Sequence, residues 1–167
     1  YGWAARHAKT DNARFMARAR VAHALLRAGH LDAAERAAAK IVSQDSASRF
    51  PASTALALVV VSHTRMQRFE FSEALQSANR AADMTGDIPP EVRAEALIAS
   101  AAAGWRLDDP QADQRGRDAE SLARAFDLTD ALMLVFAIRS LVQERRNQFE
   151  ALEATLLAAT RVAATEP

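Results

Sequence analysis

The sequence predicts an all-α fold of about eight helices arranged in antiparallel hairpins. Of its 167 residues, 40 are alanine, the residue with the highest intrinsic helix propensity. Glycine and proline contribute only five residues each, so few positions would interrupt a helix. No segment alternates apolar and polar residues as a half-buried strand does, and the β-branched run at residues 59–61 lies inside a helical pattern. A chain of this length suits a single domain of ordinary size.

Start and stop signals define the helices in the first half of the chain. The first helix is expected to end before Gly29, a residue suited to the left-handed conformation after a helix C-terminus. Asp32 is expected to cap the second helix with its carboxylate, and Glu35 follows three residues later as in a capping box. Pro51 opens the third helix, where its missing N–H needs no partner. The fourth helix is expected to start near Phe71.

Similar signals define the second half. Pro89 and Pro90 open the fifth helix, and Glu91 lies in its first turn, where the helix dipole favours an acidic residue. The turn-like stretch 107–110 separates this helix from the sixth, and the stretch 127–129 caps the seventh. The expected helices span residues 11–28, 32–43, 51–67, 71–85, 90–104, 111–126, 129–143 and 149–162.

The sequence repeats with a period of about forty residues. Residues 25–34 compare with residues 65–74, because in both segments a helix ends, an apolar residue follows and a small residue opens the next helix. Residues 147–151 match residues 29–33 position for position. A helical hairpin cannot bury its apolar face alone, so repeats of this kind are expected to stack on one another.

The repeats resemble the tetratricopeptide (TPR) family. In that family small residues recur seven positions apart on the second helix of each hairpin, and Ala74 and Ala81 keep this spacing. Val21, Ala22 and Leu25 are similar to the family's large and small positions on the first helix. The period near forty exceeds the family's repeat of about 34 residues. The resemblance implies a TPR-like right-handed α-solenoid in residues 1–146, whose first helices line a concave surface.

Two histidines are expected on this concave surface. His23 and His63 are one period apart and should therefore occupy equivalent places. Such a pair could hold a metal, sense pH or donate hydrogen bonds to a bound peptide; the alternative is an ordinary, partly buried histidine at each place. No spacing in the sequence offers a third and fourth ligand, so we expect no metal and no cofactor. The groove candidates are His23, Leu26, Arg27, His63, Met66 and Gln67.

The last expected helix carries an apolar seam. Spacings of three and four separate Phe149, Leu152, Leu156 and Ala159, as in a coiled coil. One interpretation is that residues 147–167 form a dimerising connector that leads from the repeat domain to a missing output domain and makes the protein a homodimer. The alternative is a helix packed against its own domain, which would show the same stripe.

The C-terminal sequence suggests what such a connector would reach. Residues 152–157, with Glu166 and Pro167 further on, resemble the signalling helix that leads into GGDEF-type diguanylate cyclase domains. The same residues could equally precede the DNA-binding helix-turn-helix of a LuxR-type regulator. Arginine outnumbers lysine 19 to 2, which together with the abundant alanine indicates a GC-rich bacterial source. The resemblance implies a bacterial multidomain signalling protein.

Charge is unevenly distributed, although the formal net charge is zero. Residues 1–40 carry eight basic and three acidic groups, whereas residues 83–130 carry five basic and eleven acidic groups. Solvated helix faces of opposite sign are the simplest interpretation. The alternative is that the basic end meets an acidic partner or the acidic stretch of a neighbouring copy. The basic residues concerned are Arg14, Arg18, Arg20 and Arg27.

Several classes of function are excluded or disfavoured. The absence of cysteine removes disulfides, thiolate zinc sites and cysteine nucleophiles, and it favours a reducing, cytoplasmic location. The longest uncharged stretch, residues 50–64, is shorter than the roughly 20 apolar residues of a spanning helix, so no membrane contact is expected. Balanced charge argues against direct nucleic-acid contact. No nucleophile elbow, phosphate-binding glycine loop or zinc-protease motif is present, so no catalytic residues are expected.

The sequence therefore predicts a non-catalytic regulatory or sensor domain that binds a peptide, a protein or a small ligand in its concave face. Binding is expected to bias the pairing of the C-terminal helices and so to control dimerisation of an output domain of diguanylate cyclase type. The alternatives are the TPR-like region of a LuxR-type transcriptional regulator and a plain protein-interaction scaffold.

Overall fold

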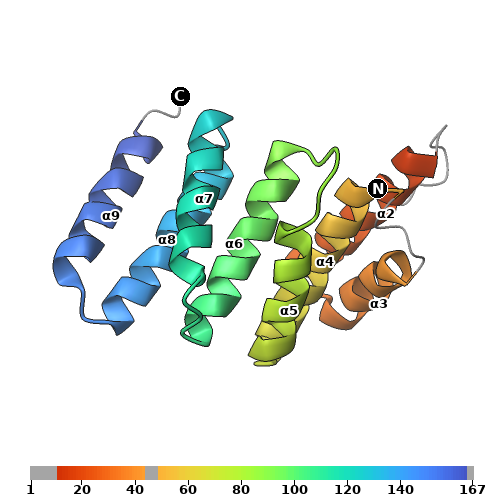
Figure 1. Cartoon of the computed structure of the whole chain (residues 1–167), viewed down its shortest axis with the longest axis horizontal. Helices are drawn as coiled ribbons and strands as arrows, with labels where there is room; N and C mark the ends of the chain where they lie inside the picture. The colour runs from red at the N-terminus through yellow and green to blue at the C-terminus, as the bar shows by residue number, and fades with distance from the viewer. Residues whose placement is uncertain (1–10, 44–48, 165–167) are drawn as a thin grey trace.

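A computed structural model of the chain describes residues 11–43 and 49–164. These residues form eight α-helices and no strand, which confirms the predicted all-α class. The helices follow one another along the long axis of the molecule, from α2 and α3 at one end to α9 at the other (Figure 1). They are α2 (Asp11–Arg27), α3 (Leu31–Val42), α4 (Pro51–Gln67), α5 (Phe71–Ala82), α6 (Pro90–Arg106), α7 (Ala112–Ala125), α8 (Thr129–Arg145) and α9 (Phe149–Ala163).

The expected helix boundaries agree with the structure to within three residues, but the predicted side-chain caps at Asp32 and in residues 127–129 are not formed, since the N-caps His30 and Leu128 make no side-chain hydrogen bond. Asp32 lies inside the first turn of α3, and the N-cap is His30, which makes no side-chain capping bond. The reason is that the preceding turn closes through the backbone, with the N–H of His30 donating to the carbonyl of Leu25 at 2.9 Å. Asp32 instead lies 2.6 Å from Nη2 of Arg68 on the next hairpin.

The turns inside the four hairpins share one backbone geometry. A residue with positive φ follows the first helix of each pair, and these residues are 40, 39 and 39 positions apart. The next residue then donates its N–H to the carbonyl five positions earlier, which is the bond that closes a helix in the Schellman motif. The turns inside the hairpins therefore recur at about the period of the sequence, and the turn between α7 and α8, at Asp127, has the same geometry. The residues with positive φ inside the hairpins are Gly29, Phe69, Asp108 and Asn147.

The contacts between helices also repeat from one hairpin to the next. The first helices of the four hairpins, α2, α4, α6 and α8, form a layer in which consecutive members touch. Of the second helices, α3, α5 and α7 each pack against two first helices, whereas α9 contacts α8 alone among the described helices. The domain boundary expected at residue 146 falls in the turn between α8 and α9, and α9 is the second helix of the fourth hairpin. Glu166 and Pro167 lie outside the described residues.

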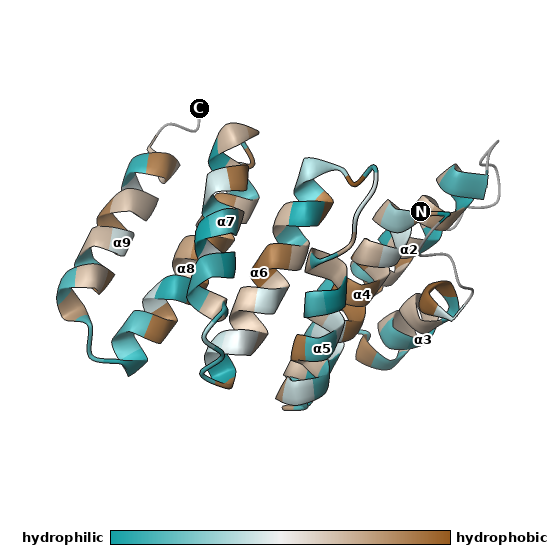
Figure 2. Ribbon diagram, viewed as in Figure 1, coloured by the Kyte–Doolittle hydropathy of each residue, from teal (hydrophilic) through white to brown (hydrophobic). Residues whose placement is uncertain are grey.

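Small side chains fill the space between the two layers. Helix α4 buries twelve of its 17 residues, and these belong to the uncharged stretch that the sequence indicated as a buried helix. Helix α7 lies on the outside and is coloured largely hydrophilic (Figure 2). Its Gly116 faces α6 so closely that a Cβ atom there would lie 2.9 Å from the ring of Trp105. Side chains of this size let neighbouring helices approach closely.

Gly116→Ala should destabilise the fold by about 1 kcal/mol, because overpacking against Trp105 outweighs the gain in helix propensity. Urea unfolding monitored by circular dichroism measures the effect. Ser121→Ala, at an exposed position of the same helix, is the matched control and should leave stability unchanged or slightly raised. A Gly116→Ala protein as stable as the control would contradict close packing at this crossing.

Gly29→Ala should also cost about 1 kcal/mol, but for a different reason. A Cβ atom at Gly29 would meet nothing within 4 Å, so the cost comes only from the left-handed backbone conformation, with φ of 79°. The reciprocal change Asn147→Gly, at the equivalent turn, should leave stability unchanged or raised. Thermal unfolding of both variants tests the prediction, and a Gly29→Ala protein as stable as the wild type, or a destabilised Asn147→Gly protein, would refute it.

Candidate ligand-binding site

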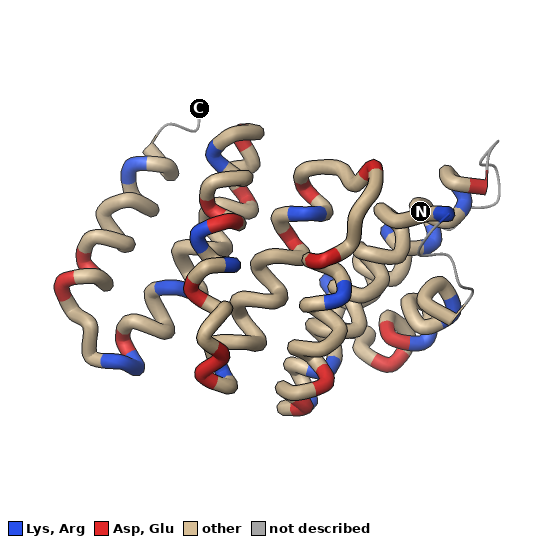
Figure 3. The backbone as a smooth tube through the Cα atoms, viewed as in Figure 1, with Lys and Arg blue, Asp and Glu red and all other residues tan. Residues whose placement is uncertain are grey.

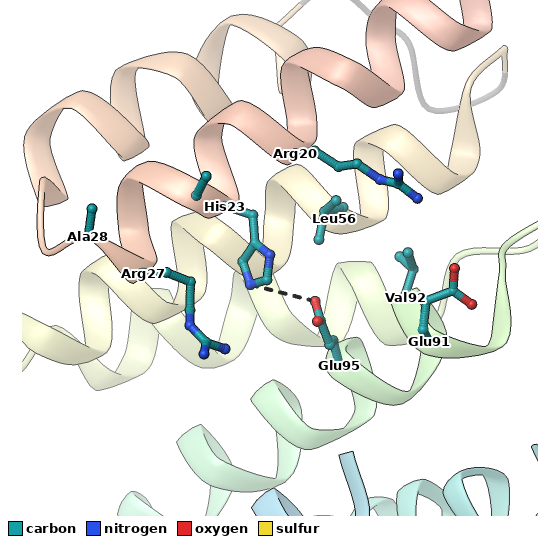
Figure 4. Close-up of a pocket in the computed structure, with 9 residues that line it drawn as sticks. Arg20, His23, Arg27, Ala28, Leu56, Glu91, Val92 and Glu95 are labelled. Atoms are coloured by element: carbon teal, nitrogen blue, oxygen red, sulfur yellow. Dashed lines mark ion pairs between the residues drawn. The ribbon is translucent and has the colours of Figure 1, made fainter. Parts of the chain in front are cut away.

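A hollow of about 570 Å³, here called the charged hollow, opens on the layer of first helices. It forms because α2 and α6 both pack against α4 while their own backbones stay apart. Leu56 of α4 lies between the two walls (Figure 4). The charged residues that line the hollow are Arg20, His23 and Arg27 from α2, and Glu91 and Glu95 from α6.

Glu95 is the most unusual residue of the charged hollow. Its Oε2 atom is buried and has no hydrogen-bond partner in the described part of the chain. Nε2 of His23 lies 3.9 Å away, close enough for an ion pair when the imidazole is protonated but too far for a hydrogen bond. Burial raises the pKa of the Glu95 carboxyl, while His23 and Arg27 act in the opposite direction. A buried acceptor without a donor is costly, so this oxygen is suited to receive one from a ligand.

The opposite wall supplies positive charge. Arg20 and Arg27 are two helical turns apart on α2, and neither forms an ion pair with a carboxylate among the described residues. Figure 4 shows both guanidinium groups on the same side of the hollow as His23, across from the two glutamates. The basic end of the chain thus faces part of the acidic stretch within the same molecule. The two walls carry opposite charge and are separated by open space.

A second hollow of about 170 Å³, here called the apolar hollow, lies one hairpin further along. Its walls come from α4, α6 and α8, just as those of the charged hollow come from α2, α4 and α6. Trp105 is among its lining residues, and its indole N–H donates to Oδ1 of Asp113 on α7. The other side chains that line it are His63, Met66, Ile138, Leu141 and the two arginines Arg106 and Arg145.

His63 links the two hollows electrostatically. Burial, with a further contribution from nearby His23, lowers its pKa from 6.5 to about 4. His63 is therefore neutral at pH 7 and presents an uncharged imidazole to the apolar hollow. The two hollows share α4 and α6 as walls and therefore lie close together on the layer of first helices.

The six groove candidates are distributed over different surroundings. His23 and Arg27 line the charged hollow, and His63 and Met66 line the apolar hollow. Leu26 is half-buried and packs against the core between α2, α3 and α4. Gln67, at the end of α4, is exposed and borders neither hollow.

Several residues that line the hollows were not predicted from the sequence. Glu91 was noted only as a residue in the first turn of its helix, and Glu95 and Arg145 were not singled out. The repeat could have indicated Glu95. In a stacked repeat the first helices of all hairpins lie in one layer, so α6 lies in the same layer as α2. The acidic excess of residues 83–130 could then have been assigned to the helix opposite Arg20 and Arg27.

The predicted dimerisation residues occupy two sides of α9. Phe149 and Leu156 are 64% and 52% exposed, and Leu152 is half-buried beside them. Ala159 is turned inward and packs against a cluster that contains Phe136 and Leu132 of α8. Leu157, which lies outside the predicted seam, is 52% exposed.

No family model, curated protein or solved structure matches the chain. Within residues 11–43 and 49–164, histidine, aspartate and glutamate side chains form no group of three that could hold a metal ion. None of the described helices combines the length and hydropathy needed to cross a bilayer. The two hollows and the surface of α9 are the features of the described residues that bear on function.

The lowered pKa of His63 predicts that stability falls as the pH is lowered from about 6.5 to about 4. In this range the unfolded chain binds a proton at His63 that the folded protein does not bind, so protonation favours unfolding. Complete titration corresponds to a loss of about 3 kcal/mol. Urea unfolding at several pH values should show that His63→Gln removes much of this dependence, whereas His30→Gln at an exposed position does not. Equal pH profiles of the two variants would contradict the assignment.

Proposed function

We propose that the chain is a non-catalytic, protein-interaction domain that binds an extended peptide across the two hollows. The observation that carries the proposal is the buried Oε2 atom of Glu95, which lacks a hydrogen-bond donor, on one wall of an open space of about 570 Å³ whose other wall carries Arg20 and Arg27. A volume of this order is typical of ligand sites. The charges fit a ligand that brings both an anionic group and a hydrogen-bond donor.

The arrangement favours a peptide over a small ion. An acidic side chain of the peptide would lie beside Arg20 and Arg27, and an amide or ammonium N–H would donate to Glu95. An apolar side chain a few residues away would enter the apolar hollow against Trp105 and Met66. The neutral imidazole of His63 suits contact with such an apolar group.

The role that we propose for this domain within a larger protein is the one expected from the sequence. The forty-residue repeat of the backbone turn supports TPR-like hairpins, for which the groove of the first helices is the surface that binds peptides. We place the domain in a cytoplasmic signalling protein of bacterial origin, in which peptide binding biases pairing of the C-terminal helices and thereby an output domain. A diguanylate cyclase is the output that the resemblance implies, and the DNA-binding part of a LuxR-type regulator is the alternative. The scaffold alternative predicts the same peptide binding without an effect on self-association.

Selection from a randomised phage-displayed peptide library tests the groove. We expect enrichment of peptides that combine an acidic residue, a donor side chain and an apolar residue. Arg27→Glu should weaken binding of an enriched peptide by at least about tenfold, because it places a carboxylate beside the acidic group of the ligand. Arg36→Glu, at an exposed position of α3 outside both hollows, is the matched control.

Trp105 provides a direct readout of the same interaction. In a Trp3→Phe background its indole fluorescence should change when an enriched peptide fills the apolar hollow. Equal affinities of the Arg27→Glu and Arg36→Glu proteins, with no change in Trp105 fluorescence, would refute a binding site in this groove.

A further inference from the structure

Helix α9 presents an apolar face that no other described helix covers. Phe149, Leu156 and Leu157 are 64%, 52% and 52% exposed, and together with Leu152 they border a shallow hollow of about 280 Å³. The opposite side of α9 packs against α8, with Thr155 as its buried residue. A contiguous apolar patch on a helix that lacks one of its neighbours is typical of an interaction surface.

The side chains on this face differ from those of α3 and α5. Leu152 and Leu156 lie three and seven residues after the start of α9. At the same positions α3 and α5 carry alanines that are fully buried, because the next first helix crosses at close range. Leucines at both positions leave no room for a helix at that distance. The face therefore suits a helix that packs through large side chains rather than another hairpin of this stack. The equivalent alanines are Ala34 and Ala38 in α3, and Ala74 and Ala78 in α5.

The charges of α9 indicate the direction of the helix that would cover it. Glu150 and Glu153 lie near its N-terminus and Arg161 near its C-terminus, and no other residue of α9 is charged. Figure 3 shows the acidic residues next to the turn after α8 and the basic residue at the far end. Two such helices in antiparallel orientation bring the acidic end of each to the basic end of the other. In parallel orientation, like charges would face each other.

We propose that α9 pairs in antiparallel orientation with α9 of a second copy of this chain. The interface consists of Phe149, Leu152, Leu156 and Leu157, with the two-fold axis between Leu156 and Leu157. Glu153 of each copy then lies beside the segment around Thr160 and Arg161 of the other. This inference rests on the dimerisation part of the proposed function and specifies its geometry, and it does not depend on the peptide-binding groove.

Cysteine crosslinking tests the orientation, because the natural chain contains no cysteine. Glu153→Cys and Thr160→Cys proteins are prepared separately in the full chain and oxidised alone or as an equimolar mixture. Antiparallel pairing predicts a disulfide-linked dimer in the mixture that joins position 153 of one chain to position 160 of the other. Each variant alone should remain largely uncrosslinked. Efficient crosslinking of each variant with itself would overturn the antiparallel arrangement, and the absence of any crosslink would overturn the pairing.

Sedimentation equilibrium measures the strength of the pairing. Leu156→Glu should raise the dimer dissociation constant by at least about tenfold, because it buries a carboxylate among leucines. Leu107→Glu is the matched control, since Leu107 is 41% exposed in the turn after α6. The single variants Glu153→Arg and Arg161→Glu should weaken the dimer, and the double variant should recover it.

A wild-type protein that stays monomeric at every concentration would overturn the inference. Recovery that fails in the double variant, while Leu156→Glu still disrupts the dimer, would overturn the orientation alone. Both measurements are made without a peptide, so their outcome is separate from the outcome of the peptide-binding experiment.

Discussion

The close approach of neighbouring helices is the constraint on which this structure depends. Alanines such as Ala38 and Ala78 are fully buried between two first helices, and Gly116 lies against Trp105 where even a methyl group would collide. Dispersion contacts among closely packed small groups supply much of the stability of such a core, although each side chain removes little apolar area from water. The same packing fixes α2 and α6 on either side of α4, so the charged hollow is a consequence of the helix stack.

The sequence predicted the fold well wherever the determining interactions are local. Helix propensity, prolines at helix starts and Gly29 at a helix end act within a few residues, and the predicted helices agree closely with the observed ones. The repeated turn was harder to recognise, because only Gly29 is a glycine among its four occurrences inside the hairpins. Phe69, an exposed phenylalanine in left-handed conformation, gave no residue signal, and its conformation is imposed by the packing of the helices on both sides.

The candidate site could be predicted only in part, because its chemistry comes from distant pairs. The period of forty residues relates His23 to His63 on neighbouring first helices, and in the structure each lines a different hollow. Glu95, however, meets His23 across 72 residues and two hairpins, and no local pattern distinguishes it from the solvated carboxylates of the same region. Its burial and its missing hydrogen-bond donor are properties of the three-helix environment alone. Leu26 and Gln67 were predicted to lie in the groove, but Leu26 packs against the core and Gln67 is exposed to solvent. Adjacent positions on a helix point in different directions, so the repeat alone does not tell which of them faces the groove.

The same constraint explains the end of the described stack. Where a following helix crosses closely, as at α3 and α5, alanine is required and leucine would separate the layers. At α9 leucines occupy these positions, so the requirement for small side chains that holds at α3 and α5 does not hold there. Large side chains are instead favoured where a helix must gain enough buried apolar area from a single partner. The change from alanine to leucine along one structural register thus sets the uncovered face of α9 apart from the faces of α3 and α5, where a first helix crosses closely.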